Sequence, residues 1–232
     1  MGVAIQKLRL VNDPLFFIGL AVRLVLVIFL LPVIHSDWFV PFLDNFINNP
    51  DIDPWRSHLN NGGNPLAFPY GPVMWLMLLP GVALGALGGA IFPAYDFQFT
   101  AIGFGLGIVV FDFLLLLALV IIVPGRRKLV IALYWLSPIV LYVNYWHGQV
   151  DIVPVLLLTA SLLAIRKRKF TLAGVILGAA FAAKMSMILA LPFILIYLGR
   201  NNRLRRFSLK FFTAVVATAA VLQGPYLLSG AV

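Results

Sequence analysis

The chain has 232 residues, of which 62% are apolar and 11% are charged, whereas a soluble domain has about 45–50% apolar and about 25% charged residues. This balance excludes a soluble globular protein. Lys and Arg number 17 against 8 acidic residues, all of them Asp, and the basic residues lie in short clusters between long apolar runs, which is typical of membrane topology rather than of nucleic-acid binding. The absence of Cys excludes disulfides, thiol nucleophiles and Cys-based metal sites.

The first apolar run, residues 14–34, is long enough to cross the hydrocarbon core of a bilayer and is interrupted only by Arg23. Lys7 and Arg9 precede it, and no small-residue cleavage site follows it. We therefore expect an uncleaved first span in the cell membrane with a cytoplasmic N-terminus.

A polar loop over residues 35–68 follows, and then an apolar stretch over residues 69–93 that hydropathy alone would assign as a span. A span there would place the basic cluster 126–128 outside, against the positive-inside rule. The stretch is also interrupted by prolines, including Pro80, and is rich in Gly. We therefore predict an interfacial or re-entrant element on the outer face, divided by its prolines into short pieces.

The rest of the chain predicts further spans, and the basic clusters at 126–128, 166–169 and 200–210 are expected on the cytoplasmic side. The sequence thus predicts an all-α, polytopic membrane helix bundle that forms one domain over residues 1–232. Its later spans are expected at about 97–123, 129–146 and 150–165, in a hairpin over 170–199, and at 207–226.

Small residues four positions apart indicate where predicted helices pack closely. Two such pairs stand out, Gly81 with Gly85 and Gly174 with Gly178. No internal repeat is present.

The loop 35–68 is the only long polar stretch, and its aromatic residues argue against disorder. Asp37 directly follows the first span, where a carboxylate at the membrane surface can act as a general base toward a hydroxyl. Asp44 offers a further polar group for binding a substrate, and Arg56 offers a basic group that could bind a phosphate. The alternative for each carboxylate in this loop is that it only faces water.

A second set of polar residues lies at the turn predicted between two spans. It consists of His147, Gln149 and Asp151, which have aromatic residues beside them in the sequence. Such a group suits a sugar, because polar side chains bond its hydroxyls while rings stack on it. The alternative for Asp151 is that it only caps the next helix.

Two ionisable residues lie inside later apolar runs, where they are costly and often functional. Lys184, at the apex of the predicted hairpin, could bind a phosphate or could snorkel to the nearer surface. Asp112 could pair structurally with Arg23 or with Lys184.

The order of several motifs resembles the integral-membrane GT-C glycosyltransferases that use polyprenyl-phosphate sugars, and among them the mannosyltransferases. The resemblance rests on an acid after the first span, FPYGP, an intramembrane acid, an SP pair, a polar turn ending in an acid, and an AG..LG.A...K pattern before a proline. These are Asp37, residues 68–72, Asp112, Ser137 with Pro138, Asp151, residues 173–184 and Pro192.

This resemblance implies a catalytic Asp37, interfacial helices after it, and Lys184 near the lipid phosphate, with Tyr70 of FPYGP among the substrate-binding residues. Such enzymes normally continue with several more spans. The resemblance therefore implies either a truncated chain or a partner subunit that supplies those spans.

The function predicted from the sequence is transfer of a hexose, such as mannose, from a polyprenyl phosphate to a hydroxyl of a glycan or lipid acceptor on the outer face. The expected partners are this lipid-linked donor, the acceptor and membrane lipids, without nucleic acid. A divalent metal is compatible with this chemistry but not required, because His35, Asp37 and Asp44 lack a tight ligand spacing.

Two alternatives without enzymatic activity remain open at this stage. In a permease or flippase, Asp112, Asp151 and Lys184 would form a substrate or proton pathway. In a scaffold subunit, the fold would be retained without activity.

Overall fold

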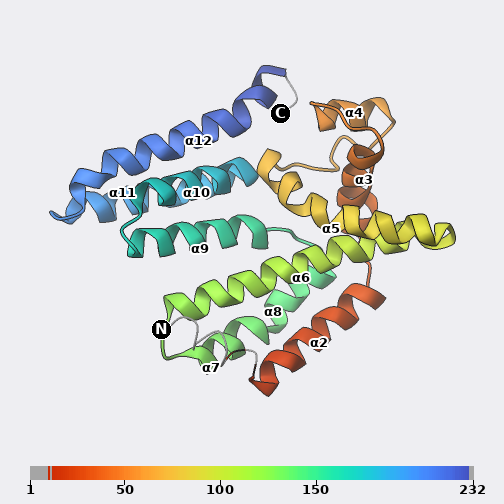
Figure 1. Ribbon diagram of the computed structural model, residues 1–232, viewed down its shortest axis with the longest axis horizontal. Helices are drawn as coiled ribbons and strands as arrows, with labels where there is room; N and C mark the ends of the chain where they lie inside the picture. Colours follow the sequence, from red (N-terminus) through yellow and green to blue (C-terminus); the bar gives the residue numbers. More distant parts are fainter. Residues whose placement is uncertain (1–9, 11, 230–232) are drawn as a thin grey trace. The chain divides into compact units, whose positions relative to one another are not determined.

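The computed structural model describes residue 10 and residues 12–229 (Figure 1). Lys7 and Arg9, on which the predicted N-terminal orientation partly rests, lie outside the described residues. Within the described part of the chain every regular element is helical, which confirms the all-α class.

The chain forms two compact units, one from Met1–Phe68 and Leu78–Ile152 and the other from Pro69–Met77 and Val153–Val232. The helices of the first unit are α2 (Pro14–Phe29), η1 (His35–Phe39), α3 (Val40–Asn48), α4 (Pro54–Asn60), most of α5 (Pro72–Ile91), η2 (Pro93–Tyr95), α6 (Asp96–Ile122), α7 (Arg127–Val130), η3 (Ile131–Trp135), α8 (Pro138–Leu141) and η4 (Tyr142–Trp146). The second unit contains the start of α5 and then α9 (Ile152–Arg166), α10 (Phe170–Ala183), η5 (Met185–Leu189), α11 (Ala190–Arg200), η6 (Arg205–Phe207) and α12 (Ser208–Ser229).

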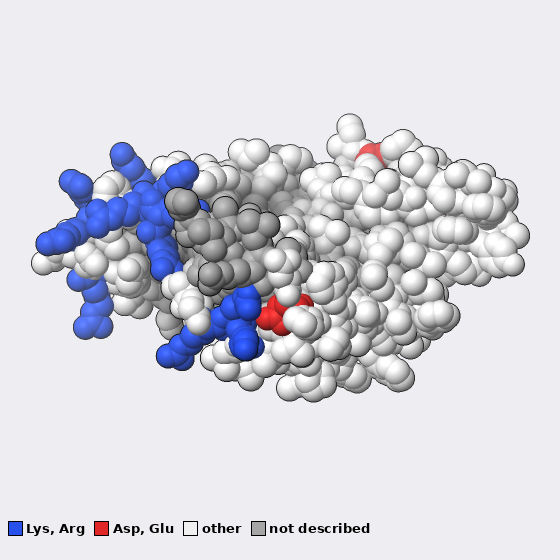
Figure 2. Space-filling model, turned by 60° about the horizontal axis from the view of Figure 1, so that its bottom comes forward, with Lys and Arg blue, Asp and Glu red and all other residues white. Residues whose placement is uncertain are grey.

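Several helices have the length and composition needed to cross a membrane. In the described part of the chain these are Pro72–Ile91, Pro93–Ile122 and Arg205–Tyr226. A fourth is formed if Arg127–Trp135 and Pro138–Trp146, which bend by 44° at the intervening break, count as one span. Figure 2 shows that Lys and Arg gather in dense groups on the face drawn, as expected for a membrane protein.

Helix α2 begins and ends at positions that its sequence explains. The Asp13 carboxylate caps its start by accepting a hydrogen bond from the Leu15 backbone N–H at 3.2 Å. The helix stops at Phe29, short of the predicted end at residue 34, and Leu30 is already extended. Pro32 accounts for this end, because it cannot donate a backbone hydrogen bond and disfavours a helical residue before it.

Helix α5 runs unbroken from Pro72 to Ile91 with Pro80 inside it. The prediction that Pro80 divides this segment is therefore wrong, while its interfacial or re-entrant placement stays a prediction. Gly81 lies against the backbone of Gly103, and Gly85 against that of Phe99, so closely that an added Cβ would clash. This packing on α6 supports the part of the helix that follows the proline.

The second unit is built around the pair α10 and α12, which run side by side (Figure 1). A Cβ on Gly174 would meet the carbonyl of Phe211, and one on Gly178 would meet the carbonyl of Val215. Both pairs of small residues found in the sequence therefore form close helix contacts, as predicted.

A buried ion pair joins α2 to α6 in the first unit. Arg23 Nε donates to Asp112 Oδ2 at 2.6 Å, and both side chains are fully buried. The Asp112 carboxylate also accepts from the hydroxyls of Tyr134, at 2.6 Å, and Tyr145, at 2.9 Å. The network thus fixes η3 and η4 against α2 and α6 and confirms the pairing of Asp112 with Arg23.

Candidate active site

Asp37 lies in η1, a π-helical turn that leads directly into α3. Single π turns occur often at functional sites because they change the direction of side chains on a helix. The Asp37 carboxylate is exposed and accepts a hydrogen bond of 2.6 Å from Ser36 Oγ. It is therefore held in place by a neighbour and remains open to a ligand.

The segment of Asp37 is anchored by its neighbour His35, which is buried. His35 Nε2 lies 3.0 Å from the carbonyl oxygen of Gly148, and because a carbonyl can only accept, Nε2 carries the proton. Burial lowers the pKa of His35 to about 4, with the Gly148 hydrogen bond acting in the opposite direction. The ring is therefore neutral at physiological pH.

Gly148 makes this contact possible in two ways. Its φ of +87° lies in the left-handed region that favours glycine. A Cβ on Gly148 would also meet the Pro32 Cβ at 2.9 Å and the His35 ring at 3.0 Å. The turn after η4 therefore approaches the end of the first helix as closely as a glycine allows.

The contact between His35 and Gly148 joins two segments that lie far apart in the sequence, the one that contains Asp37 and the turn that contains His147. His147 and Gln149 flank Gly148, and Asp37 lies two residues after His35. His147 is exposed, and Gln149 and Asp151 are half-buried. The structure thus brings the segment of the predicted base and the predicted sugar-binding turn to one place in the first unit.

Aromatic side chains border this turn. Tyr142 is 55% exposed and Trp146 is 61% exposed, and the rings of Tyr142 and His147 lie 6.3 Å apart between centroids. Exposed rings beside polar groups provide both stacking and hydrogen bonding. This surface can accommodate a sugar.

Asp44 and Arg56 lie on α3 and α4 rather than at the contact of His35 with Gly148. The Asp44 carboxylate accepts from Asn48 Nδ2 at 3.2 Å. Its pKa is raised by burial and by the negative charge of Asp96, against the effect of the Asn48 bond. Arg56 is largely exposed, with Nε 3.6 Å from the carboxylate of Asp53.

The loop that carries these residues is folded around aromatic rings, as its composition predicted. The rings of Phe42 and Phe68 stack at 4.6 Å between centroids. Trp55 Nε1 donates to the carbonyl of Phe68 at 3.0 Å. Asn61 Nδ2 donates to Asn45 Oδ1 at 2.7 Å and ties α4 to α3.

In the second unit the structure brings Lys184 and Tyr70 together. Lys184 is half-buried at the break between α10 and η5, where its backbone is extended. Its ammonium lies 5.4 Å from the centre of the Tyr70 ring, within range of a cation–π interaction. The Gly71 N–H donates to the carbonyl of Ala183 at 3.0 Å, so the FPYGP segment is fixed beside the lysine.

Sequence reasoning did not single out His35 and Gly148 as a pair. The available signal was a glycine inside a polar turn, which often marks a close backbone approach. Among the described residues no three His, Asp or Glu side chains form a group that could hold a metal ion.

Comparisons with known proteins agree with the GT-C resemblance. Residues 65–231 match glycosyltransferase family 87. Over 101 residues the chain is 38% identical to GPI mannosyltransferase 1 of Eremothecium gossypii, a match that covers 43% of this chain but only 25% of that protein. No solved structure matches the sequence. Since the family match covers more than half of the chain, this chain belongs to glycosyltransferase family 87, in agreement with the GT-C resemblance.

Proposed function

We propose that the protein transfers a hexose from a polyprenyl-phosphate donor to an acceptor hydroxyl of a glycan or lipid on the outer face of the cell membrane. Family membership supports the glycosyl transfer. The observation that carries the assignment of the site is the contact of His35 with Gly148, because it ties the segment that contains the exposed Asp37 to the turn that contains His147 and Gln149.

In the proposed reaction Asp37 takes the proton of the acceptor hydroxyl. The oxygen then attacks C1 of the hexose, the bond from C1 to the phosphate oxygen breaks, and the polyprenyl phosphate leaves with the electron pair. The configuration at C1 is inverted. His147, Gln149 and Asp151 are assigned to the sugar hydroxyls, and Asp44 and Arg56 to the outer parts of the substrates.

Lys184 is assigned to the phosphate of the donor, and its surroundings support this role. An ammonium within a membrane hairpin is costly unless an anion or an aromatic face stabilises it. Tyr70 supplies such a face, and a donor phosphate would supply the anion.

Mannose is the proposed hexose, because the relative with 38% identity is named a mannosyltransferase. The family match favours this enzyme over the permease, flippase and scaffold alternatives. A chain that spans a quarter of that relative can also act together with a partner subunit, so the assay should use membranes as well as purified protein.

The test is a transfer assay with polyprenyl-phosphate mannose labelled in the sugar. The protein, in proteoliposomes, should release polyprenyl phosphate only when an acceptor is added. Labelled nucleotide-sugars should not replace this donor. Transport of the intact donor across the bilayer without cleavage of the bond at C1 would instead establish a flippase.

The proposed orientation places the N-terminus in the cytoplasm and the loop 35–68 outside. Because the chain has no native Cys, single cysteines at the exposed positions Asn64 and Lys167 report it directly. An impermeant thiol reagent on intact cells should label Asn64→Cys and spare Lys167→Cys. The reverse pattern would overturn the orientation.

A further inference from the structure

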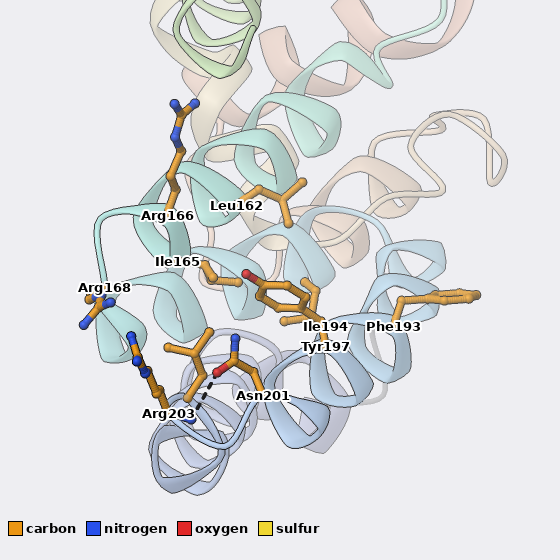
Figure 3. A pocket seen from close by; sticks show the side chains of 10 residues that line it. Leu162, Ile165, Arg166, Arg168, Phe193, Ile194, Tyr197, Asn201 and Arg203 are labelled. Carbon is orange, nitrogen blue, oxygen red and sulfur yellow. Dashed lines mark hydrogen bonds between the residues drawn. The ribbon is translucent and has the colours of Figure 1, made fainter. Parts of the chain in front are cut away.

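A cavity of about 750 Å³ lies in the second unit, at the ends of α9 and α11 (Figure 3). Three arginines, a tyrosine, an asparagine and several apolar residues form its walls. They are Leu162, Ile165, Arg166, Arg168, Phe193, Ile194, Tyr197, Asn201, Arg203 and Leu204. In the view of Figure 3 the three guanidinium groups lie to one side of the cavity and Phe193 to the other.

The sequence of the unit that contains this cavity is strongly basic. No Asp or Glu follows residue 151 in the sequence, and the segment Pro69–Met77 contains none either. The segments 166–169 and 200–210, from which the three lining arginines come, contain nine basic residues, which are Arg166, Lys167, Arg168, Lys169, Arg200, Arg203, Arg205, Arg206 and Lys210. Such a concentration favours binding of an anion from outside the chain.

Arg168 is placed beside the cavity at a cost to the backbone. Its φ of 57° is the left-handed conformation in which helices usually place glycine after their last turn. The adjacent Lys169 N–H closes this turn on the carbonyl of Ala164 at 2.9 Å. An arginine at this position is strained where glycine would not be, which suggests that its side chain has a use.

The other wall of the cavity is apolar and open. Phe193 is 73% exposed and Tyr197 is 56% exposed, and Leu162 and Ile194 adjoin them. A small free anion would leave this wall and most of the volume unused. A ligand that carries a phosphate next to hydrocarbon chains would use both walls.

We propose that this cavity binds an anionic glycerophospholipid, with the lipid phosphate against Arg168 and Arg203 and an acyl chain along Phe193 and Leu162. The clusters beside it are assigned to the cytoplasmic side by the positive-inside rule, and basic pockets between membrane helices on that side suit anionic headgroups. The ligand is thus a lipid of the inner leaflet.

This site is separate from the proposed donor site. Arg168 precedes α10 and Lys184 follows it, so the 14 residues of this helix place the two about 20 Å apart at about 1.5 Å per residue. Lipid binding at the cavity therefore requires neither Asp37 nor Lys184. Failure of the proposed function would therefore leave lipid binding at the cavity testable, and failure of lipid binding would leave sugar transfer testable.

The test measures binding of dioleoyl-phosphatidylglycerol to the detergent-purified protein by native mass spectrometry. The variant Arg168→Gln with Arg203→Gln should lose at least about tenfold in affinity, since it removes two charged hydrogen-bond donors. The control Lys167→Gln with Arg205→Gln removes the same charge from residues that do not line the cavity. It should stay within about twofold of the parent.

A second variant shows whether weaker lipid binding results from misfolding. Arg168→Gly removes the side chain and places glycine at a left-handed position. It should melt at the same or a higher temperature than the parent and still bind the lipid more weakly. A lower melting temperature or unchanged lipid binding would contradict the proposed role of Arg168.

Other ligands distinguish the source of the phosphate. Dioleoyl-phosphatidylcholine, inorganic phosphate and polyprenyl phosphate should each bind more weakly than the anionic phospholipid. Equal affinity for any of the three would overturn the proposal, and so would equal losses in the cavity variant and its charge-matched control. The latter result would mean that the arginines only form a positive surface.

Discussion

The imidazole of His35 donates a hydrogen bond to the carbonyl of Gly148 at 3.0 Å, across 113 residues of sequence. The ring also lies edge-on to Phe104 of α6, with 4.7 Å between the ring centroids. His35 is therefore a buried positioning residue that ties the segment of Asp37 to the turn of His147. The geometry of the proposed site around Asp37 and His147 depends on this contact.

Gly148→Ala should disrupt the site more than an alanine at another left-handed glycine. Gly125 provides the control, because its φ is +82° and nothing lies within 4 Å of the Cβ that it would carry. Each substitution should cost about 1–2 kcal/mol for the left-handed backbone. Only Gly148→Ala also displaces His35, so it alone should lower glycosyl transfer at least about tenfold in proteoliposomes. Equal transfer by the two variants would contradict this.

Stability should fall on acidification because His35 is held neutral. Its pKa is about 4 in the fold against an ordinary value of 6.5, so the unfolded chain takes up the proton first as the pH falls. The neutral His35 therefore contributes about 3 kcal/mol to the free energy of unfolding above pH 6.5. This contribution is lost as the pH falls from 6.5 to about 4.

The measurement is thermal unfolding in detergent over this pH range. The variant His35→Gln retains a side-chain donor but cannot titrate, so its stability should depend less steeply on pH than that of the parent. Parallel curves for the two proteins would show that His35 does not titrate as described.

Lys184 should control the use of the donor through its charge. Lys184→Gln should weaken donor affinity about 10- to 150-fold, the equivalent of a charged hydrogen bond of about 1.5–3 kcal/mol. Lys184→Arg should retain part of the affinity. A proton-pathway lysine behaves differently, because arginine does not release its proton and would be as harmful as glutamine.

Polyprenyl-phosphate binding to the parent and both variants in detergent measures this effect. Tyr70→Phe is the matched control, since it retains the ring beside the ammonium and loses only the hydroxyl. It should bind the donor nearly as well as the parent. Identical binding by the parent and both Lys184 variants would reject the phosphate role.

The buried pair Arg23 and Asp112 should contribute to stability as a unit. Asp112→Leu leaves the Arg23 charge uncompensated and should cost about 3–5 kcal/mol. Adding Arg23→Met should recover part of this loss. Recovery should be incomplete, because Tyr134 and Tyr145 still lose the acceptor of their hydroxyls. In thermal unfolding, a double variant no more stable than Asp112→Leu would contradict this account.

The sequence could predict those features that depend on local pattern or on a rare residue type. Gly174 and Gly178 indicated the close packing of α10 on α12, because small residues allow helix backbones to approach. Asp112 required a partner because it is ionisable within an apolar run. Arg23 and Lys184 were its possible partners, because both are basic residues that also lie within apolar runs. The structure pairs Asp112 with Arg23.

Features that depend on distant contacts could not be predicted. Pro80 indicated a break in α5, but the contacts of Gly81 and Gly85 with α6 support a continuous helix. The glycine in the polar turn could indicate a close backbone approach, but nothing in the sequence could identify His35 as its partner, since the contact joins residues 113 positions apart. Nothing in their spacing could show that Asp37 and His147 belong to one part of the structure.

The most direct test of the proposed function is the activity of Asp37→Asn. This substitution preserves size and the hydrogen bond from Ser36 while removing the basicity of the group. Asp51→Asn is the control, because Asp51 is an exposed residue in the same loop, and its carboxylate accepts a hydrogen bond from the backbone N–H of Asp53. Both variants should express and fold like the parent. With labelled polyprenyl-phosphate mannose and an acceptor, Asp37→Asn should lose at least about a hundredfold in transfer rate while Asp51→Asn stays within about twofold; transfer by Asp37→Asn at the rate of the parent would contradict the role of Asp37 as the base.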